Sequence, residues 1–378
     1  MGVRPGVLRV RLGGGVEPLA EHCTVHGSSL AMLGAALCCL PLAAATAAAP
    51  APPSPVPTVA LFNAAAPGLR MPATGMGTGC AIGGCSFAAP QPFASLNMSK
   101  QWLAIGGRRF DGADSYGIEP GIGEAIKQSG VARSEVFITS KTGPGGLAWP
   151  LGYNETLDQA KQIVANYSTS YVDLLLIHWP TNYGPCSYHG PKPSIPTTDP
   201  ACDTSGPHYS AKACRLSTWR AMVAVWKMGL AKAIGVSNFN TTHLKELADA
   251  GLPTPSVNQA EFNPTHGLSA KGCTPGSATE TCGELLDYCK AHKIHYQGYS
   301  PYGGAHSAGK LLGDPRLAKI AAAHGTGASQ VVLAWQWQLG ISVNPEARQL
   351  EYQEENLHFF NFTLSAAELE VLSTWTKA

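Results

Sequence analysis

From residue 58 onward, short apolar runs alternate with longer stretches that have the apolar spacing of amphipathic helices. Residues 172–179 (Val-Asp-Leu-Leu-Leu-Ile-His-Trp) are almost continuously apolar, as a strand buried on both faces should be. The pattern predicts main strands at residues 71–79, 107–113, 136–142, 172–179, 231–237, 256–262, 294–300 and 341–343. Residues 58–61 and 68–70 are compatible with a preceding hairpin.

Helical patterns follow most of these strands. They are expected at residues 121–129, 156–167, 217–227, 242–250, 284–292, 315–324, 329–338, 352–359 and 365–375. Strands that alternate with helices imply right-handed βαβ units and a parallel sheet, and eight units favour closure into a (β/α)8 TIM barrel of the α/β class. A doubly wound sheet is the alternative, but no strand precedes a Gly-x-Gly-x-x-Gly helix start.

The expected domain organisation is a targeting segment at residues 1–49, a Pro-rich linker at 50–57 and one barrel domain at 58–378. Residues 30–49 are uncharged and rich in Ala and Leu, and they end in small-x-small triplets that are typical of a signal-peptide cleavage site. A signal anchor and an Ala-rich linker are the alternatives, and Pro41 disfavours a stable membrane span. We expect entry into the secretory pathway, with a cytoplasmic location as the alternative.

Two long loops interrupt the barrel domain, at residues 180–216 and 263–283, and both are rich in Cys, Pro, Gly, Ser and Thr. Both follow strand ends, so both should lie on the catalytic face of a barrel. Of the eleven cysteines, eight lie beyond the targeting segment, in or near loops, which suggests disulfides whose pairing the sequence leaves open. Their spacing matches no paired zinc motif, so no metal site is expected.

Composition narrows the classes of partner. The net charge is +1, and 13% of residues are charged. There is no basic surplus that would favour nucleic acid and no charge run typical of an interaction tail. We therefore expect a monomer that acts on a small molecule.

Four polar residues stand near the C-terminal ends of predicted strands, where barrel enzymes assemble their sites. They are Asp111, Tyr116, Lys141 and His178. Each has an ordinary structural explanation, such as an ion pair, packing or a core histidine. Together they complement one another: an ammonium group favours a phenolate, a carboxylate aims the ammonium, and an imidazole can orient a carbonyl oxygen. The set suits protonation of an oxygen while hydride arrives at carbon.

The four segments resemble the Asp-Tyr-Lys-His tetrad of the aldo-keto reductases, including the five-residue step from Asp to Tyr. The resemblance spans residues 58–375 and continues in order along the chain. It includes Met-Gly-Thr at 76–78, Ala-Ile-Gly-Val-Ser-Asn-Phe-Asn at 233–240, Val-Asn-Gln-Ala-Glu-Phe-Asn-Pro at 257–264 and Tyr-Ser-Pro-Tyr-Gly at 299–303.

This resemblance implies a cofactor, NADPH or NADH, across the barrel mouth beside Asp111. Its nicotinamide would contact the backbone of Gly77 and Thr78 and stack on Tyr299. Its carboxamide would bind three polar side chains, namely Ser237, Asn238 and Gln259. The remaining matches are Ser300 toward the pyrophosphate, Glu355 and Asn356 toward adenine, and Trp179 as a wall of the substrate pocket.

The sequence departs from the family where the 2′-phosphate of NADPH is usually bound by Lys-Ser and a later Arg. Those places hold Glu346, Ala347 and Tyr352, with Arg348 nearby. A carboxylate repels a phosphate but accepts hydrogen bonds from a free ribose hydroxyl, so NADH has equal standing. On the substrate side, Gly79 and Cys80 replace the usual aromatic residue, and the usual extended C-terminal substrate loop is expected to be missing.

The expected activity is reduction of an aldehyde or ketone to an alcohol, with Tyr116 as the general acid and hydride from nicotinamide. A cofactor-binding regulatory protein on the same barrel is the alternative. A hydrolase that pairs Asp111 with Glu119 is a third hypothesis, but Glu119 is better placed as the start of a helix. Because nicotinamide cofactors are intracellular, an exported reductase would belong in a lumenal compartment or in a plastid reached through the secretory route.

Overall fold

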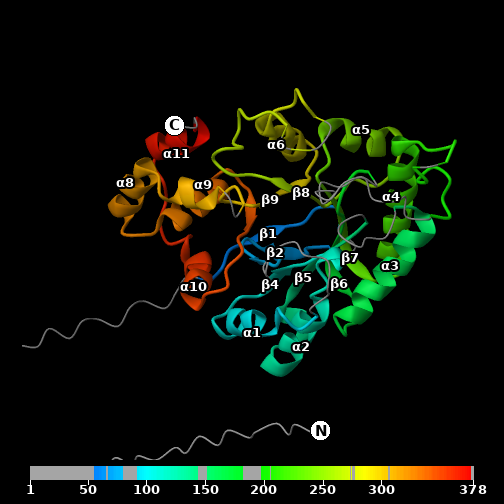
Figure 1. Cartoon of the computed structure of the whole chain (residues 1–378), viewed down its shortest axis with the longest axis horizontal. Helices are drawn as coiled ribbons and strands as arrows, with labels where there is room; N and C mark the ends of the chain where they lie inside the picture. Colours follow the sequence, from blue (N-terminus) through cyan, green and yellow to red (C-terminus); the bar gives the residue numbers. More distant parts are fainter. Residues whose placement is uncertain are drawn as a thin grey trace, which may run out of the picture. The chain divides into compact units, whose positions relative to one another are not determined.

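The computed structural model describes residues 55–64, 67–79, 92–143, 151–181, 197–204, 206–272, 274, 277–304 and 307–375, all within one compact unit, Pro52–Ala378. The predicted targeting segment and residues 50–54 of the linker lie outside the described residues. Eight parallel strands form one sheet in chain order, surrounded by helices (Figure 1). The strands are β3 (Met76–Gly77), β4 (Arg109–Asp111), β5 (Phe137–Thr142), β6 (Val172–Ile177), β7 (Ala231–Ser237), β8 (Val257–Glu261), β9 (His295–Tyr299) and β10 (Ser342–Asn344).

The first and last strands of this sheet meet, so the sheet closes into the predicted barrel. Backbone hydrogen bonds run from Gly75 N to Val343 O (3.0 Å), from Gly77 N to Pro345 O (2.9 Å) and from Val343 N to Ala73 O (2.9 Å). The contact is so close that a Cβ on Gly77 would lie 2.8 Å from the carbonyl oxygen of Asn344. Glycine at position 77 therefore lets the two strands approach.

Helices cover the outside of the barrel. Their bounds are α1 (Leu96–Ala104), α2 (Glu119–Ser129), α3 (Tyr153–Asn166), α4 (Ala211–Lys227), α5 (Thr241–Asp249), α6 (Cys282–Ala291), α7 (Ala308–Leu312), α8 (Pro315–His324), α9 (Ala328–Gln338), α10 (Leu350–His358) and α11 (Ala366–Ser373). Two of them, α1 and α7, were not predicted from sequence. Helix α7 is only five residues long and follows a glycine-rich turn, so its periodic signal is weak.

The first predicted strand, residues 71–79, is wrong as a single element. Residues Arg70–Pro72 form β2, which pairs antiparallel with β1 (Thr58–Ala60), and only Met76–Gly77 joins the barrel as β3. The hairpin therefore begins as expected but ends two residues later. The reason is tertiary: Met71 is fully buried by the inner core described below, which fixes the register of the hairpin.

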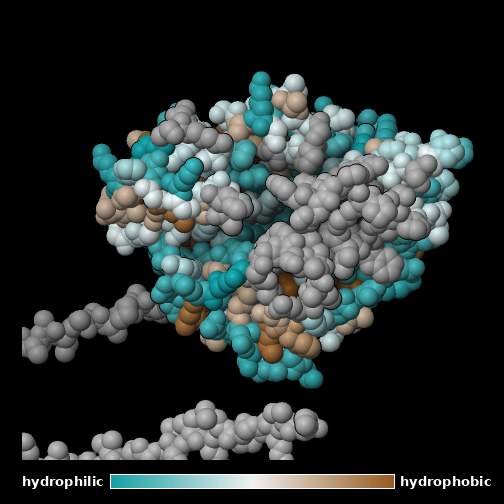
Figure 2. Space-filling model, viewed as in Figure 1, coloured by the Kyte–Doolittle hydropathy of each residue, from teal (hydrophilic) through white to brown (hydrophobic). Residues whose placement is uncertain are grey.

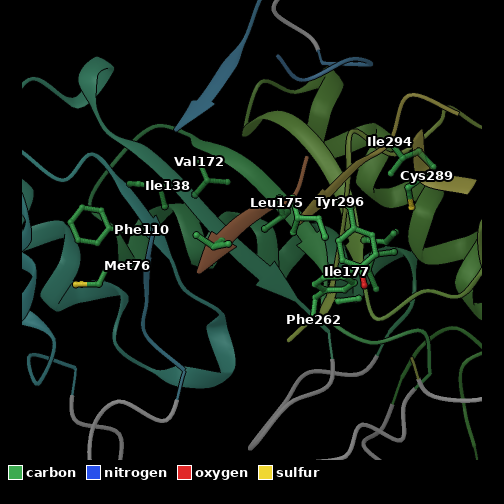
Figure 3. Close-up of a cluster of buried hydrophobic side chains, with 14 of the residues drawn as sticks. Met76, Phe110, Ile138, Val172, Leu175, Ile177, Phe262, Cys289, Ile294 and Tyr296 are labelled. Atoms are coloured by element: carbon green, nitrogen blue, oxygen red, sulfur yellow. The ribbon is translucent and has the colours of Figure 1, made fainter. Parts of the chain in front are cut away.

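Two hydrophobic cores occupy opposite sides of the strands, because successive side chains of a strand point to opposite faces. The larger core lies between strands and helices and includes Phe110, Ile138 and Leu175, three of the side chains drawn in Figure 3. The smaller, inner core combines hairpin side chains with strand residues; its buried members are Leu61, Met71, Phe137, Leu174, Leu176, Ala233 and Val257. The hairpin thus covers the N-terminal end of the barrel.

The cysteine-rich loops are shorter than the sequence suggested. Helix α4 begins at Ala211 rather than near residue 217, and a disulfide joins Cys202 in the preceding loop to Cys214 inside this helix. Cys282 and Cys289 are both buried in α6: Cys282 is its first residue, next to the preceding loop, and Cys289 lies near its end. Their helical spacing of seven places both on the apolar side of α6, toward the core.

The described surface in Figure 2 mixes hydrophilic and hydrophobic residues, with hydrophilic ones frequent over the outer helices. Among the described residues, no helix is both long enough and apolar enough to cross a bilayer.

Candidate active site

Polar and aromatic side chains line a cavity of about 400 Å³ at the C-terminal ends of the strands. Its lining residues come from segments far apart in the chain, because parallel strands of a closed barrel end on the same rim. The lining residues that the sequence analysis had assigned to the site are Gly77, Thr78, Asp111, Tyr116, His178, Trp179, Ser237, Asn238, Gln259, Tyr299 and Ser300. Most of the predicted residues therefore meet at one site, and Glu346 also lines this cavity.

Asp111, which lines the cavity, and Lys141, which does not, form a buried ion pair. The Nζ of Lys141 donates to Oδ1 of Asp111 (2.6 Å) and to the carbonyl oxygen of Gly112 (2.8 Å), and the lysine side chain is 1% exposed. A buried ion pair holds its geometry when further hydrogen bonds satisfy the remaining lone pairs. Asp111 meets this condition, because its other oxygen, Oδ2, accepts from the Gln259 and Asn344 side chains.

Tyr116 lies beside this pair on a short 3-10 turn, Asp114–Tyr116. The turn ends at Gly117, whose φ of 64° is left-handed and suits glycine. The Nζ of Lys141 is 5.2 Å from the centroid of the phenol ring. Gly79 leaves room for the ring, since a Cβ there would lie 3.1 Å from the Tyr116 hydroxyl. The geometry sets a phenol next to a buried ammonium group, as the sequence predicted.

His178 follows β6 and faces Tyr116 edge-on, with 5.7 Å between ring centroids. Burial, followed by the charge of Lys141, holds the pKa of His178 well below its ordinary value, so the imidazole is neutral at pH 7. Its Nδ1 is buried and has no hydrogen-bond partner among the described residues. His178 itself lines the cavity, and a neutral imidazole there is suited to binding a ligand oxygen.

The three residues expected to bind a carboxamide form one hydrogen-bonded network with Tyr299. The amide of Asn238 donates to the Ser237 hydroxyl (3.1 Å) and to the carbonyl oxygen of His178 (2.9 Å), while its Oδ1 accepts from the Tyr299 hydroxyl (2.9 Å). Asn238 holds this position with a φ of 63°, in the left-handed region that asparagine tolerates better than most residues. Such backbone strain, held by surrounding contacts, is frequent at functional sites.

Other predicted residues lie further from the cavity. Glu355 accepts a hydrogen bond from Ser329 (2.8 Å), and Asn356 is 3.5 Å from the hydroxyl of Tyr302, which lines the cavity. Neither Glu355 nor Asn356 is itself part of the lining. At the positions where the sequence analysis places the 2′-phosphate end, Glu346 and Arg348 form an ion pair with 3.7 Å between Oε1 and Nε. Tyr352 is 49% exposed on α10.

Three residues that the sequence analysis did not single out belong to the site or support it. Asn344 and Tyr302 line the cavity, and Arg109 is buried below Asp111. Arg109 precedes Asp111 by two positions, and this spacing places both side chains on one face of a strand. That signal was present in the sequence. No local signal marks Asn344, whose partners are more than 230 residues away.

Glu119 begins α2, as the sequence analysis expected, but its charge at neutral pH differs from that expectation. It is 1% exposed, and burial, with help from Asp114, raises its pKa to about 8. At pH 7 it is therefore mostly protonated rather than a negative charge at the helix dipole. This result also opposes the hydrolase hypothesis, which required Glu119 as an ionised partner of Asp111.

The site fits a nicotinamide cofactor by its chemistry. The imidazole of His178, the polar residues Ser237, Asn238 and Gln259, and the aromatic Tyr299 all line the same cavity. Flat heteroaromatic ligands favour aromatic walls with a few polar groups that fix their orientation. Among the described residues, no cluster of His, Cys, Asp and Glu offers a metal site.

Comparison with known proteins agrees with this geometry. A family model described as "Aldo/keto reductase family" matches residues 76–374. Among curated relatives, a D-galacturonate reductase of Fragaria ananassa is 32% identical over 326 residues, which cover 84% of this chain and 91% of the relative. A glyoxal reductase of Bacillus subtilis (strain 168) is also 32% identical, over 85% of this chain and 93% of the relative.

Solved structures show the same architecture. An aldo-keto reductase from Brucella melitensis superposes with a TM-score of 0.62 and 29% identity, covering 84% of this chain and 98% of that one. Another aldo-keto reductase, solved as a complex with NADPH, has a TM-score of 0.66 and 28% identity over 84% of this chain and 87% of that one. The barrel, the ordered motifs and these matches together show that the chain belongs to the aldo/keto reductase family.

Proposed function

We propose that this protein reduces an aldehyde or ketone to an alcohol with a nicotinamide cofactor as the hydride donor. The observation that carries the proposal is the arrangement of a phenol (Tyr116), a buried ammonium–carboxylate pair (Lys141–Asp111) and a neutral imidazole (His178) around one cavity. These groups can bind a carbonyl oxygen and deliver a proton to it.

Each side chain has a distinct part in this chemistry. The hydroxyl of Tyr116 donates the proton to the carbonyl oxygen, and Lys141 favours the phenolate that remains. Asp111 holds Lys141 in place through the 2.6 Å ion pair. Neutral His178 orients the carbonyl oxygen between itself and Tyr116. When bound, the cofactor supplies the hydride that reduces the carbonyl carbon.

The cofactor would be held by the backbone of Gly77 and Thr78, by Ser237, Asn238 and Gln259 around the carboxamide, and by Tyr299 against the ring. Solved relatives contain NADPH or NADP. In this chain Glu346 stands on the cavity wall, and its only ion-pair partner among the described residues is Arg348. A carboxylate at that place disfavours a 2′-phosphate, so we propose that NADH binds at least as well as NADPH.

The relatives support carbonyl substrates of small size, since two of them are named for the reduction of galacturonate and glyoxal. The wall formed by Trp179, which stacks on His178 with 5.8 Å between centroids, would hold the carbon skeleton of such a substrate. We propose a small aldehyde or ketone as the substrate class.

The testing experiment is titration of the purified barrel, residues 58–378, with NADPH and NADH while tryptophan fluorescence is followed. Trp179 lines the cavity, so a bound cofactor should quench it, and a Trp179→Phe variant should lose part of that signal. Binding is then followed by turnover with a panel of aldehydes and ketones. If folded protein binds neither cofactor, the reductase proposal fails. Binding without any turnover would favour a regulatory role on the same barrel.

We also propose that the chain enters the secretory pathway. The disulfide between Cys202 and Cys214 supports this, because such bonds persist mainly in oxidising compartments. Expression of the full chain in a eukaryotic cell, with amino-terminal sequencing of the product, tests it. A product that retains the first 49 residues in the cytoplasm would contradict the proposal.

A further inference from the structure

A fully buried arginine lies inside the barrel directly below the ion pair of the site. Arg109 is 0% exposed and belongs to β4, two residues before Asp111. Its space depends on Gly75, because a Cβ at position 75 would lie 2.2 Å from the Nε of Arg109. Burying a cation is costly unless it is paired or fully hydrogen-bonded, so a role for its charge or its donors is expected.

The guanidinium group has no carboxylate within ion-pair distance among the described residues. It donates instead to oxygens of neighbouring strands: Nη1 to the carbonyl oxygen of Pro72 (2.6 Å), and Nη2 to the carbonyl oxygen of Val343 (2.5 Å) and to Oδ1 of Asn344 (2.5 Å). Burial lowers the pKa of Arg109 to about 9, so it remains charged at neutral pH.

Asn344 connects this cation to the site. Its Oδ1 accepts from Arg109, and its Nδ2 donates to Oδ2 of Asp111 (3.0 Å). Only this orientation of the amide works, because the reverse would set its NH₂ group against the guanidinium donors. The chemistry of Arg109 therefore decides which end of the Asn344 amide faces Asp111.

The consequence for Asp111 is a carboxylate held on both oxygens. Oδ1 receives Lys141, and Oδ2 receives Gln259 (2.7 Å) together with Asn344. Without Asn344, the carboxylate could rotate about its Cβ–Cγ bond and release Lys141 from its alignment with Tyr116. We propose that Arg109 and Asn344 are positioning residues that fix Asp111, and through it Lys141, for proton transfer by Tyr116.

The charges around the pair give the proposal a second consequence. Burial lowers the pKa of His178 and His295, with a smaller contribution from Lys141 and Arg109 respectively, while burial raises that of Glu119. These three groups are therefore mostly neutral at pH 7. Among the described residues at the site, the buried charges are two cations (Arg109 and Lys141) and one anion (Asp111), while Asp114 and Glu346 are less buried. Buried Asp173 and Arg215 form ion pairs elsewhere. The surplus positive charge favours the phenolate of Tyr116.

The test compares Arg109→Met, Arg109→Lys and Asn344→Leu with the wild type, and uses Arg108→Met as the matched control. Arg108 is the adjacent arginine, and its side chain donates to the carbonyl oxygens of Leu103 and Gly107, outside the site. All variants are first checked for folding by circular dichroism and for cofactor affinity by fluorescence titration. The measurements are kcat, KM and the pH dependence of kcat/KM.

Asn344→Leu keeps the side-chain volume but removes the donor to Asp111, so kcat should fall roughly 10-fold with little change in cofactor affinity. Arg109→Met should lower kcat as well. It should also move the alkaline limb of the pH profile of kcat/KM upward by roughly one pH unit, since the Tyr116 hydroxyl then stays protonated to higher pH. Arg109→Lys keeps the charge, so it should leave that limb in place. Arg108→Met should match the wild type.

The proposal is overturned if folded Asn344→Leu keeps the wild-type kcat, or if Arg109→Lys moves the alkaline limb as far as Arg109→Met. Should Arg109→Met fail to fold, Asn344→Leu alone decides. Because the proposal rests on the proposed reductase function, tyrosinate absorbance provides a readout without turnover. Subtracting the tyrosinate absorbance of the matching Tyr116→Phe protein isolates the pH titration of Tyr116. This titration should shift to higher pH in Arg109→Met. An unshifted titration would overturn the proposal even if no carbonyl substrate is found.

Discussion

The two halves of the barrel interior are built from the same strands but have opposite character. Toward the N-terminal end, β5 contributes Phe137 and β6 contributes Leu174 to an apolar core sealed by the β1–β2 hairpin. Toward the C-terminal end, β5 carries Lys141, which pairs with the cavity residue Asp111, and β6 ends beside His178, which lines the cavity. The two halves lie close together along each strand: Leu176 of the inner core is only two positions before His178. We call the N-terminal end of the barrel interior its lower half and the C-terminal end its upper half. We infer that the lower half holds the fold together, whereas the upper half retains polar groups, costly to bury, for chemistry.

Tyr116→Phe should have the largest effect on the function of the upper half while leaving the lower half unchanged. Loss of the hydroxyl removes the proposed general acid, so turnover should fall about 10²–10⁴-fold. Cofactor affinity and the melting temperature should stay near wild type, since the ring that packs against His178 and Gly79 remains. Steady-state kinetics and fluorescence titration check this, and undiminished turnover would refute the role of Tyr116.

The reciprocal change is Leu174→Ala in the lower half. Leu174 is fully buried in the inner core, so truncation should destabilise the fold by about 2–5 kcal/mol. Well below the melting temperature, kcat should change little. Urea unfolding measures the first effect, with Val371→Ala on the surface of α11 as the control (37% exposed). A large loss of kcat in folded Leu174→Ala would show that the halves are not separable.

Glu119 extends the comparison of the two halves, because it is a titratable group that is almost fully buried. Its folded-state pKa is raised to about 8, from an ordinary value of 4.5. Its contribution to stability is therefore complete below pH 4.5 and is lost as the pH rises through about 8. The free energy of unfolding of the wild type should therefore fall between pH 5 and pH 9. In Glu119→Gln, which cannot ionise at this position, the fall should be smaller by an amount on the order of a few kcal/mol. Parallel pH profiles for variant and wild type would contradict this.

The smallest expected effect concerns the rim of the upper half. Glu346→Lys replaces a carboxylate on the cavity wall with an ammonium group, which attracts a phosphate. The ratio of NADPH to NADH affinity should rise roughly 10-fold, because a favourable charge contact replaces a repulsive one. Fluorescence titration of both cofactors measures the ratio. Glu370→Lys, an exposed position on α11 outside the cavity lining, makes the same charge change and is the control. An unchanged ratio in Glu346→Lys would remove Glu346 from the cofactor site.

Much of the fold and the site was accessible from local patterns. The apolar runs gave the positions of seven barrel strands within a few residues, and the ends of those runs indicated Asp111, Lys141 and His178. The short first strand was misplaced, because two residues of β3 carry too little period-2 signal and Met71 is buried by the hairpin. Helix α1 was missed, although its buried residues Met98 and Trp102 have helical spacing.

The sequence by itself determined which chemical groups stand at the strand ends, because alternation along a strand is a local property that fixes which side chains point inward. Only the tertiary structure decided the charge and the partners of those groups. Glu119 is mostly neutral at pH 7 because it is buried, and Asp111 on β4 is held by Gln259 on β8 and Asn344 on β10 because the barrel brings these strands around one interior. Such contacts join residues more than a hundred positions apart, and burial depends on every element that packs around them.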